Sequence, residues 1–140
     1  MTALKKVLLL TIIVILCVGL LSACQVTYPV SESDSYFEET MELLSAGDIK
    51  GAKKLNGIIK GDIMEKQLQT AMECLAGRKV TQYKKTSSEI TNRRSTGGAE
   101  TRETASYEAI LEDGTVLSIW TVYNDGLGVK GFSSFEPQVN

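Results

Sequence analysis

A long apolar stretch near the N-terminus divides this chain into two unlike parts. Residues 7–21 form a run of 15 amino acids that is interrupted only by Thr11 and Gly19. Lys5 and Lys6 precede the run and small residues follow it, which is the pattern of a secretory signal peptide. As a helix the run would reach about 22 Å, which is shorter than a bilayer core of about 30 Å. We therefore expect residues 1–23 to be a cleaved leader that takes no part in the fold.

The end of the leader carries a specific motif. It reads Leu21-Ser22-Ala23-Cys24, an apolar residue and two small residues before a cysteine. This order resembles the lipobox of bacterial lipoproteins, and the resemblance covers these four residues and the leader before them. It implies a diacylglycerol joined to the Cys24 thiol, cleavage between Ala23 and Cys24, and further acylation of the new amine. The alternative is an ordinary signal peptide, or an uncleaved anchor, with a chance cysteine.

The same resemblance implies a location. Two or three acyl chains anchor a protein durably, whereas one chain binds a membrane only marginally. Lipid on Cys24 would hold the chain at a cell membrane or outer membrane, with its domain on the extracytoplasmic side. Gln25 favours the outer membrane in a Gram-negative cell, a distinction that does not exist in a Gram-positive one. The sequence does not indicate which kind of cell this is.

The composition of the remaining chain excludes several classes of site. The chain has no histidine, so histidine metal sites and Ser-His-Asp or Cys-His catalysis are excluded. A Ser-Lys pair is the simplest substitute, but no Ser-x-x-Lys sequence occurs. Glu38 and Glu42 share a helix face, where a solvated surface explains them better than a metal site. We expect no metal, no cofactor and no catalytic residue, and a structural role for the unpaired Cys74.

Nucleic acid is an improbable partner for this chain. Removal of the leader, whose charges are Lys5 and Lys6, lowers the formal charge from −2 to −4. The remaining charges are segregated, with acidic residues between 32 and 48 and basic residues between 78 and 94. Such a distribution can orient a protein near an anionic membrane or steer a protein partner. An ordinary solvated surface is the simpler explanation.

Helical spacing of apolar residues occurs before residue 78. Phe37, Met41 and Leu44 recur at steps of four and three, which places them on one helix face. Ser35 is expected to cap this helix, and Glu38 to complete a capping box. The same spacing predicts two further helices, over residues 48–55 and 62–76.

After residue 78 the apolar period changes to two, which is typical of strands. Asp113-Gly114 is the strongest hairpin signal in the chain. Residues 92–100 contain the run Ser-Thr-Gly-Gly and are expected to form a loose loop. The predicted strands span residues 79–85, 101–112, 115–123 and 128–135.

Helices followed by a strand meander predict an α+β fold, with three N-terminal helices on one face of a curved antiparallel sheet of about four strands. This order and the Asp113-Gly114 turn resemble the NTF2-like or cystatin-like fold that small bacterial lipoproteins often have. Residues 43–55, LLSAGDIKGAKKL, resemble the first helix-turn-helix of that fold. The predicted organisation is a leader over residues 1–23, a lipidated cysteine and tether over 24–33, and one domain over 34–136.

Aromatic side chains on the predicted strands are the candidates for binding. In the NTF2-like arrangement the sheet and helices can enclose an apolar pocket. The same side chains could instead fill a closed core, and the sequence leaves both readings open. The candidate pocket residues are Tyr83, Tyr107, Trp120, Tyr123 and Phe132.

These features favour a membrane-anchored, non-enzymatic lipoprotein that binds a protein partner or a small apolar ligand at the cell envelope. One alternative, implied by the fold resemblance, is a pocket hydrolase or isomerase that uses carboxylates and tyrosines. Another is an envelope inhibitor or immunity module that docks through a sheet edge. The identity of the ligand and the oligomeric state do not follow from the sequence.

Overall fold

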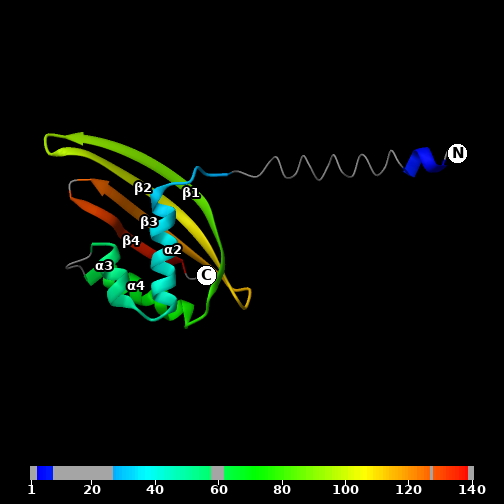
Figure 1. Ribbon diagram of the computed structural model, residues 1–140, viewed down its shortest axis with the longest axis horizontal. Helices are drawn as coiled ribbons and strands as arrows, with labels where there is room; N and C mark the ends of the chain where they lie inside the picture. Colours follow the sequence, from blue (N-terminus) through cyan, green and yellow to red (C-terminus); the bar gives the residue numbers. More distant parts are fainter. Residues whose placement is uncertain (1–2, 8–26, 58–61, 127, 139–140) are drawn as a thin grey trace.

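The computed structural model describes residues 3–7, 27–57, 62–126 and 128–138 (Figure 1). Its folded part is α+β, with helices followed by four antiparallel strands, which confirms the predicted fold class. Residues 3–7 are helical. The predicted cleavage site between Ala23 and Cys24 lies outside the described residues, so the lipobox stays a prediction.

The helices of the folded part bury apolar stripes against the sheet. Phe37, Met41 and Leu44 are buried on the first of them, and Leu68 and Leu75 on the last. Burial of such stripes, rather than intrinsic helix propensity, provides most of the stability of helices this short. The helices are α2 (Glu32–Ser45), α3 (Ile49–Leu55) and α4 (Asp62–Leu75).

The start of α2 differs from the sequence prediction. The N-cap is Ser31 rather than Ser35, and the helix begins at Glu32. The backbone N–H of Ser31 donates to the Asp34 carboxylate over 3.1 Å, as an acidic residue at this position of a capping box does. Ser31 with Asp34 and Ser35 with Glu38 have the same three-residue spacing. Only Ser31 also bonds to the sheet, through Glu103 and Lys85. The packed part of the chain therefore begins at Ser31.

The four strands form one open sheet in sequence order, β1-β2-β3-β4, so β1 and β4 are its edges. The predicted hairpin at Asp113-Gly114 is confirmed, since it joins β2 to β3 with Gly114 at φ +84°. A positive φ of this kind suits glycine because it has no Cβ. The strands are β1 (Val80–Ser95), β2 (Gly98–Leu111), β3 (Val116–Gly126) and β4 (Val129–Gln138).

The predicted loose loop over residues 92–100 is wrong. β1 continues to Ser95, a turn at Thr96 and Gly97 follows, and β2 begins at Gly98. The pairing runs to Ser95 opposite Gly98, so β1 and β2 form one long hairpin. Residues 89–99 are all exposed, which explains why no apolar alternation marks them as strand. The end of this hairpin is visible in Figure 1, beyond the helices.

The helices lie on one face of the sheet, and the core fills the space between them (Figure 1). Phe37 is at its centre, stacked on Tyr107 with ring centroids 4.1 Å apart and in contact with Tyr83 and Phe135. Along β2, every second residue from Glu103 to Leu111 is buried on this inner face. None of the helices α2, α3 and α4 lies on the opposite, outer face of the sheet (Figure 1).

A buried asparagine connects two helices to strand β4. The side-chain amide of Asn56, at the end of α3, donates to Thr40 of α2 over 3.1 Å. Its oxygen accepts the backbone N–H of Phe132 over 3.0 Å. Gly131 makes this approach possible, because a Cβ there would lie 2.7 Å from the Asn56 Cα. Asn56 directly follows the helix predicted over residues 48–55, and its side chain joins α2, α3 and β4.

Candidate functional site

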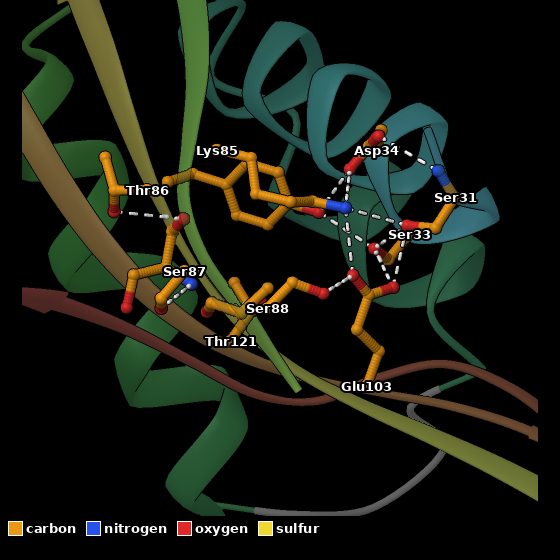
Figure 2. A network of polar contacts seen from close by, with 12 residues as sticks. Ser31, Ser33, Asp34, Lys85, Thr86, Ser87, Ser88, Glu103 and Thr121 are labelled. Carbon is orange, nitrogen blue, oxygen red and sulfur yellow. Dashed lines mark hydrogen bonds and ion pairs between the residues drawn. The ribbon is translucent and has the colours of Figure 1, made fainter. Parts of the chain in front are cut away.

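The most highly connected polar cluster lies where the start of α2 meets the inner face of β1 and β2 (Figure 2). Lys85 of β1 is at its centre, with a side chain that is 8% exposed. Its ammonium contacts Asp34 at 2.7 Å, Glu103 at 2.9 Å and the Ser31 hydroxyl at 2.9 Å. An ammonium group has three N–H donors, so these three acceptors satisfy all of them. We call this set of residues, with Ser33, Ser88 and Tyr107, the Lys85 network.

Glu103 is the most deeply buried carboxylate of the Lys85 network. Its side chain is 4% exposed. One carboxylate oxygen accepts the hydroxyls of Ser31 and Ser33, and the other accepts Lys85 and the Ser88 hydroxyl, over 2.7–2.9 Å. Burial raises the pKa of this carboxyl, but the bonds from Lys85 and the three serines outweigh it and hold the pKa at about 2. Glu103 is therefore an anion with every acceptor position filled.

Tyr107 closes the network against the aromatic core. Its hydroxyl donates to Asp34 over 2.7 Å and lies 2.8 Å from the Ser33 hydroxyl. Burial raises the pKa of Tyr107, the bond with Ser33 lowers it, and the Asp34 and Glu103 carboxylates raise it further. The phenol therefore stays neutral and acts as a donor.

The Lys85 network brings Ser31 and Lys85 within hydrogen-bond distance, although no Ser-x-x-Lys motif occurs in the sequence. A Ser-Lys nucleophile needs a neutral amine that takes a proton from the hydroxyl. Here the Ser31 hydroxyl donates to Glu103, and all three N–H groups of Lys85 are directed to acceptors. The geometry suits a buried, charge-balanced connection rather than a nucleophile and its base.

The sequence contained a partial signal for this network. Lys85 is two residues after Tyr83, and Glu103 is four residues before Tyr107. In strands with alternating faces, both charged side chains therefore lie on the same inner face as these tyrosines. Opposite charges at inward positions of neighbouring strands predict a buried pair. An irregularity between Lys85 and Ser87 also shifts the register of β1 on β2, and the sequence does not mark it.

The five candidate pocket residues do not lie together. Tyr107, Tyr123 and Phe132 are buried in the core, and Tyr83 is packed against it. Trp120 pairs with Ser106 and Glu136 and belongs to the outer face, on the other side of the sheet. The structure therefore does not place all five around one cavity.

A groove does open beside Tyr83, between the second half of α2 and the first residues of β1. Its volume is about 380 Å³, it is partly open to solvent, and its strand residues belong to β1, an edge of the sheet. We call it the α2–β1 groove. It is lined by Met41, Glu42, Ser45, Ala46, Gly77, Lys79, Val80 and Tyr83.

The two charge clusters predicted from the sequence are partly neutralised by pairing. Lys85 and Asp34 pair inside the Lys85 network, and Glu32 pairs with Lys130 at 2.5 Å. Arg78 pairs with Asp113 at 2.6 Å, a contact that lowers the pKa of this carboxyl to about 2. Two members of each cluster are therefore in ion pairs, Glu32 and Asp34 of the acidic one and Arg78 and Lys85 of the basic one.

Cys74 is half-buried on α4 and forms no disulfide. Within residues 3–7, 27–57, 62–126 and 128–138, no group of three or more acidic or cysteine side chains could hold a metal ion. Among the helices in those ranges, none is both long and apolar enough to cross a membrane. No family model, no curated protein and no solved structure matches this chain.

Proposed function

We propose that this chain is a lipid-anchored lipoprotein of the bacterial envelope that binds a partner and catalyses no reaction. Residues 1–23 would be removed, and acyl chains on Cys24 would hold the domain on the extracytoplasmic side of a membrane. The observation that supports the anchor is the motif Leu21-Ser22-Ala23-Cys24 directly after an apolar run of signal-peptide length.

The way the domain begins fits a tether attached at Cys24. Only residues 25–30 separate Cys24 from Ser31, so the lipid and the domain could be at most about 25 Å apart. The Lys85 network fixes Ser31 and Asp34 to two strands of the sheet. A pull on the tether would therefore act on the best-connected polar cluster of the domain rather than on a frayed helix end.

The ionisable groups support binding over catalysis. The Lys85 network is the main cluster of buried charges in the described part of the chain, and its carboxylate and ammonium have no unused hydrogen-bonding positions. A general acid or base must exchange a proton with a substrate that can reach it. The α2–β1 groove is accessible, but its walls are mostly apolar, with Glu42 and Lys79 as its charged residues.

We also propose that the domain has an NTF2-like or cystatin-like fold. The helices on one face of a four-stranded antiparallel meander support this assignment. An envelope inhibitor or immunity module remains the second candidate. It is favoured by β1, a 16-residue strand at the sheet edge that a partner could pair with.

The test is labelling of cells with an alkyne fatty acid, followed by detection of the label on this chain. The parent chain should carry the label, and Cys24→Ala should carry none and accumulate as unprocessed precursor. Cys74→Ala is the matched control and should be labelled like the parent, since this half-buried thiol lies within α4. Undiminished labelling of Cys24→Ala would refute the anchor.

A further inference from the structure

The α2–β1 groove adjoins a free sheet edge. Within the described part of the chain, β1 pairs with β2 on one side only, so half of its backbone N–H and C=O groups are directed away from the sheet. Natural proteins usually shorten, cover or charge such edges, because an exposed edge pairs with other chains. Val80 and Tyr83 belong both to this edge strand and to the groove wall.

The shape of the groove suits a single side chain of an added strand. Its volume of about 380 Å³ is at the low end for a small-molecule pocket, and it is partly open rather than enclosed. Met41, Ala46 and Val80 provide apolar walls. In strand addition, main-chain hydrogen bonds provide affinity and pockets for alternate side chains provide specificity.

The charges on the α2 side of the groove indicate which residues of an added strand would flank the side chain that enters the groove. Glu42 lines the groove, and Glu38 lies one turn earlier on the same face of α2. Burial, followed by the charges of Glu42 and Glu38, raises the pKa of Tyr83 to about 12. Both glutamates are exposed, and neither takes part in any of the ion pairs among the described residues. Lys79 is the basic side chain on the opposite wall, so the negative charges of Glu38 and Glu42 are on the α2 side of the groove.

We propose that the α2–β1 groove and the β1 edge bind an extended, basic segment of a partner protein. The segment adds as a fifth strand beside β1 and places one apolar side chain in the groove. Lysine or arginine two residues before and after this side chain lies on the same face and meets Glu38 and Glu42, because alternate residues of a strand share a face. This inference rests on the proposed binding function and names the class of partner.

The probe is a fluorescein-labelled heptapeptide, Thr-Lys-Thr-Leu-Thr-Lys-Thr, titrated by anisotropy into the full chain in detergent micelles. Its two lysines flank leucine at a spacing of two, so they share its face in either strand direction. The control is the isomer Lys-Thr-Thr-Leu-Thr-Thr-Lys, in which the spacing of three moves both lysines to the opposite face. We expect the first peptide to bind about five-fold more tightly, since two exposed ion pairs together provide about 1 kcal/mol.

Protein variants locate the binding surface. The double variant Glu38→Gln with Glu42→Gln should lose the preference for the first peptide. Glu39→Gln should keep it, since Glu39 is exposed on the same helix but does not act on Tyr83. Backbone amides within residues 80–86 should exchange more slowly when the peptide is bound, because an added strand pairs with them.

Three outcomes would overturn the proposal. They are equal binding of the two isomers, an unchanged preference in the double variant, and formation of dimers through β1 in the absence of peptide. Fatty-acid labelling at Cys24 is scored in the same preparations. If the preference for the first peptide is lost but labelling is intact, only the proposal of a basic partner segment is rejected. If labelling is lost, the proposal of a lipid anchor on Cys24 is rejected.

Discussion

Replacement of Glu103 by glutamine tests whether the Lys85 network stabilises the fold as a charged unit. Glutamine keeps the shape of the side chain but removes the negative charge that faces Lys85 at 2.9 Å. It also replaces one acceptor oxygen by a donor, so at least one of the serine hydroxyls loses its partner. Lys85 would then remain buried with Asp34 as its only counter-charge.

The size of the effect follows from two independent arguments. A fall of the Glu103 pKa from 4.5 to about 2 on folding corresponds to a stabilisation of about 3 kcal/mol at neutral pH. Removal of one partner from a buried ion pair typically costs about 3–5 kcal/mol. We therefore expect Glu103→Gln to lower the free energy of unfolding by about 3 kcal/mol at pH 7.

The effect should depend on pH in one direction. A carboxyl whose pKa is lowered by folding stabilises the protein fully above its unfolded pKa of 4.5, and this contribution is lost as the pH falls toward 2. The free energies of unfolding of the parent and Glu103→Gln should therefore converge between pH 4.5 and pH 2.

The assay is urea unfolding of the chain from Gln25 onward, followed by the fluorescence of Trp120, the single tryptophan. Glu89→Gln is the matched control, because Glu89 is exposed on β1 and should change stability by less than about 0.5 kcal/mol. A difference below about 1 kcal/mol for Glu103→Gln at pH 7, or one that does not shrink in acid, would refute the reasoning.

Three further predictions follow from the fold. Gly131→Ala should lower the free energy of unfolding by more than about 2 kcal/mol in urea titrations, because its Cβ would meet the Asn56 backbone at 2.7 Å. The control Gly128→Ala, whose Cβ would meet nothing within 4 Å, should lower it by only about 1 kcal/mol. Equal losses in the two variants would contradict the close approach of Gly131 to Asn56. The chain from Gln25 onward should fold alone, since the core lies between Tyr36 and Phe135; a disordered far-UV spectrum would reject one autonomous domain. Arg78→Ala should lower the thermal midpoint by about 4–8 °C, because Arg78 donates to the Cys74 and Leu75 carbonyls at the end of α4; a shift below about 1 °C would contradict this capping role.

Parts of the fold followed directly from the sequence because they are encoded locally. The spacing of Phe37, Met41 and Leu44 identified the buried side of α2, and Asp113-Gly114 located the β2–β3 turn. Both signals act over a few residues, where chain geometry leaves few alternatives.

The features that were missed depend on contacts between distant residues. The far half of the β1–β2 hairpin is exposed on both faces, so nothing buried imposes an alternating pattern on it. The choice of Ser31 over Ser35 as the cap of α2 depends on bonds to Glu103, 72 residues later along the chain. Trp120 was placed with the pocket residues because it is aromatic, whereas its position along β3 puts it on the outer face.

The central claim is that lipid on Cys24 joins this domain to a membrane, and mass spectrometry of the chain purified from its native cells tests it most directly. A lipid-anchored chain gives an N-terminal peptide that begins at Cys24 and is heavier than its amino acids by a diacylglyceryl group, with or without a further acyl chain. An N-terminus at Met1 with no added mass on Cys24 would contradict it.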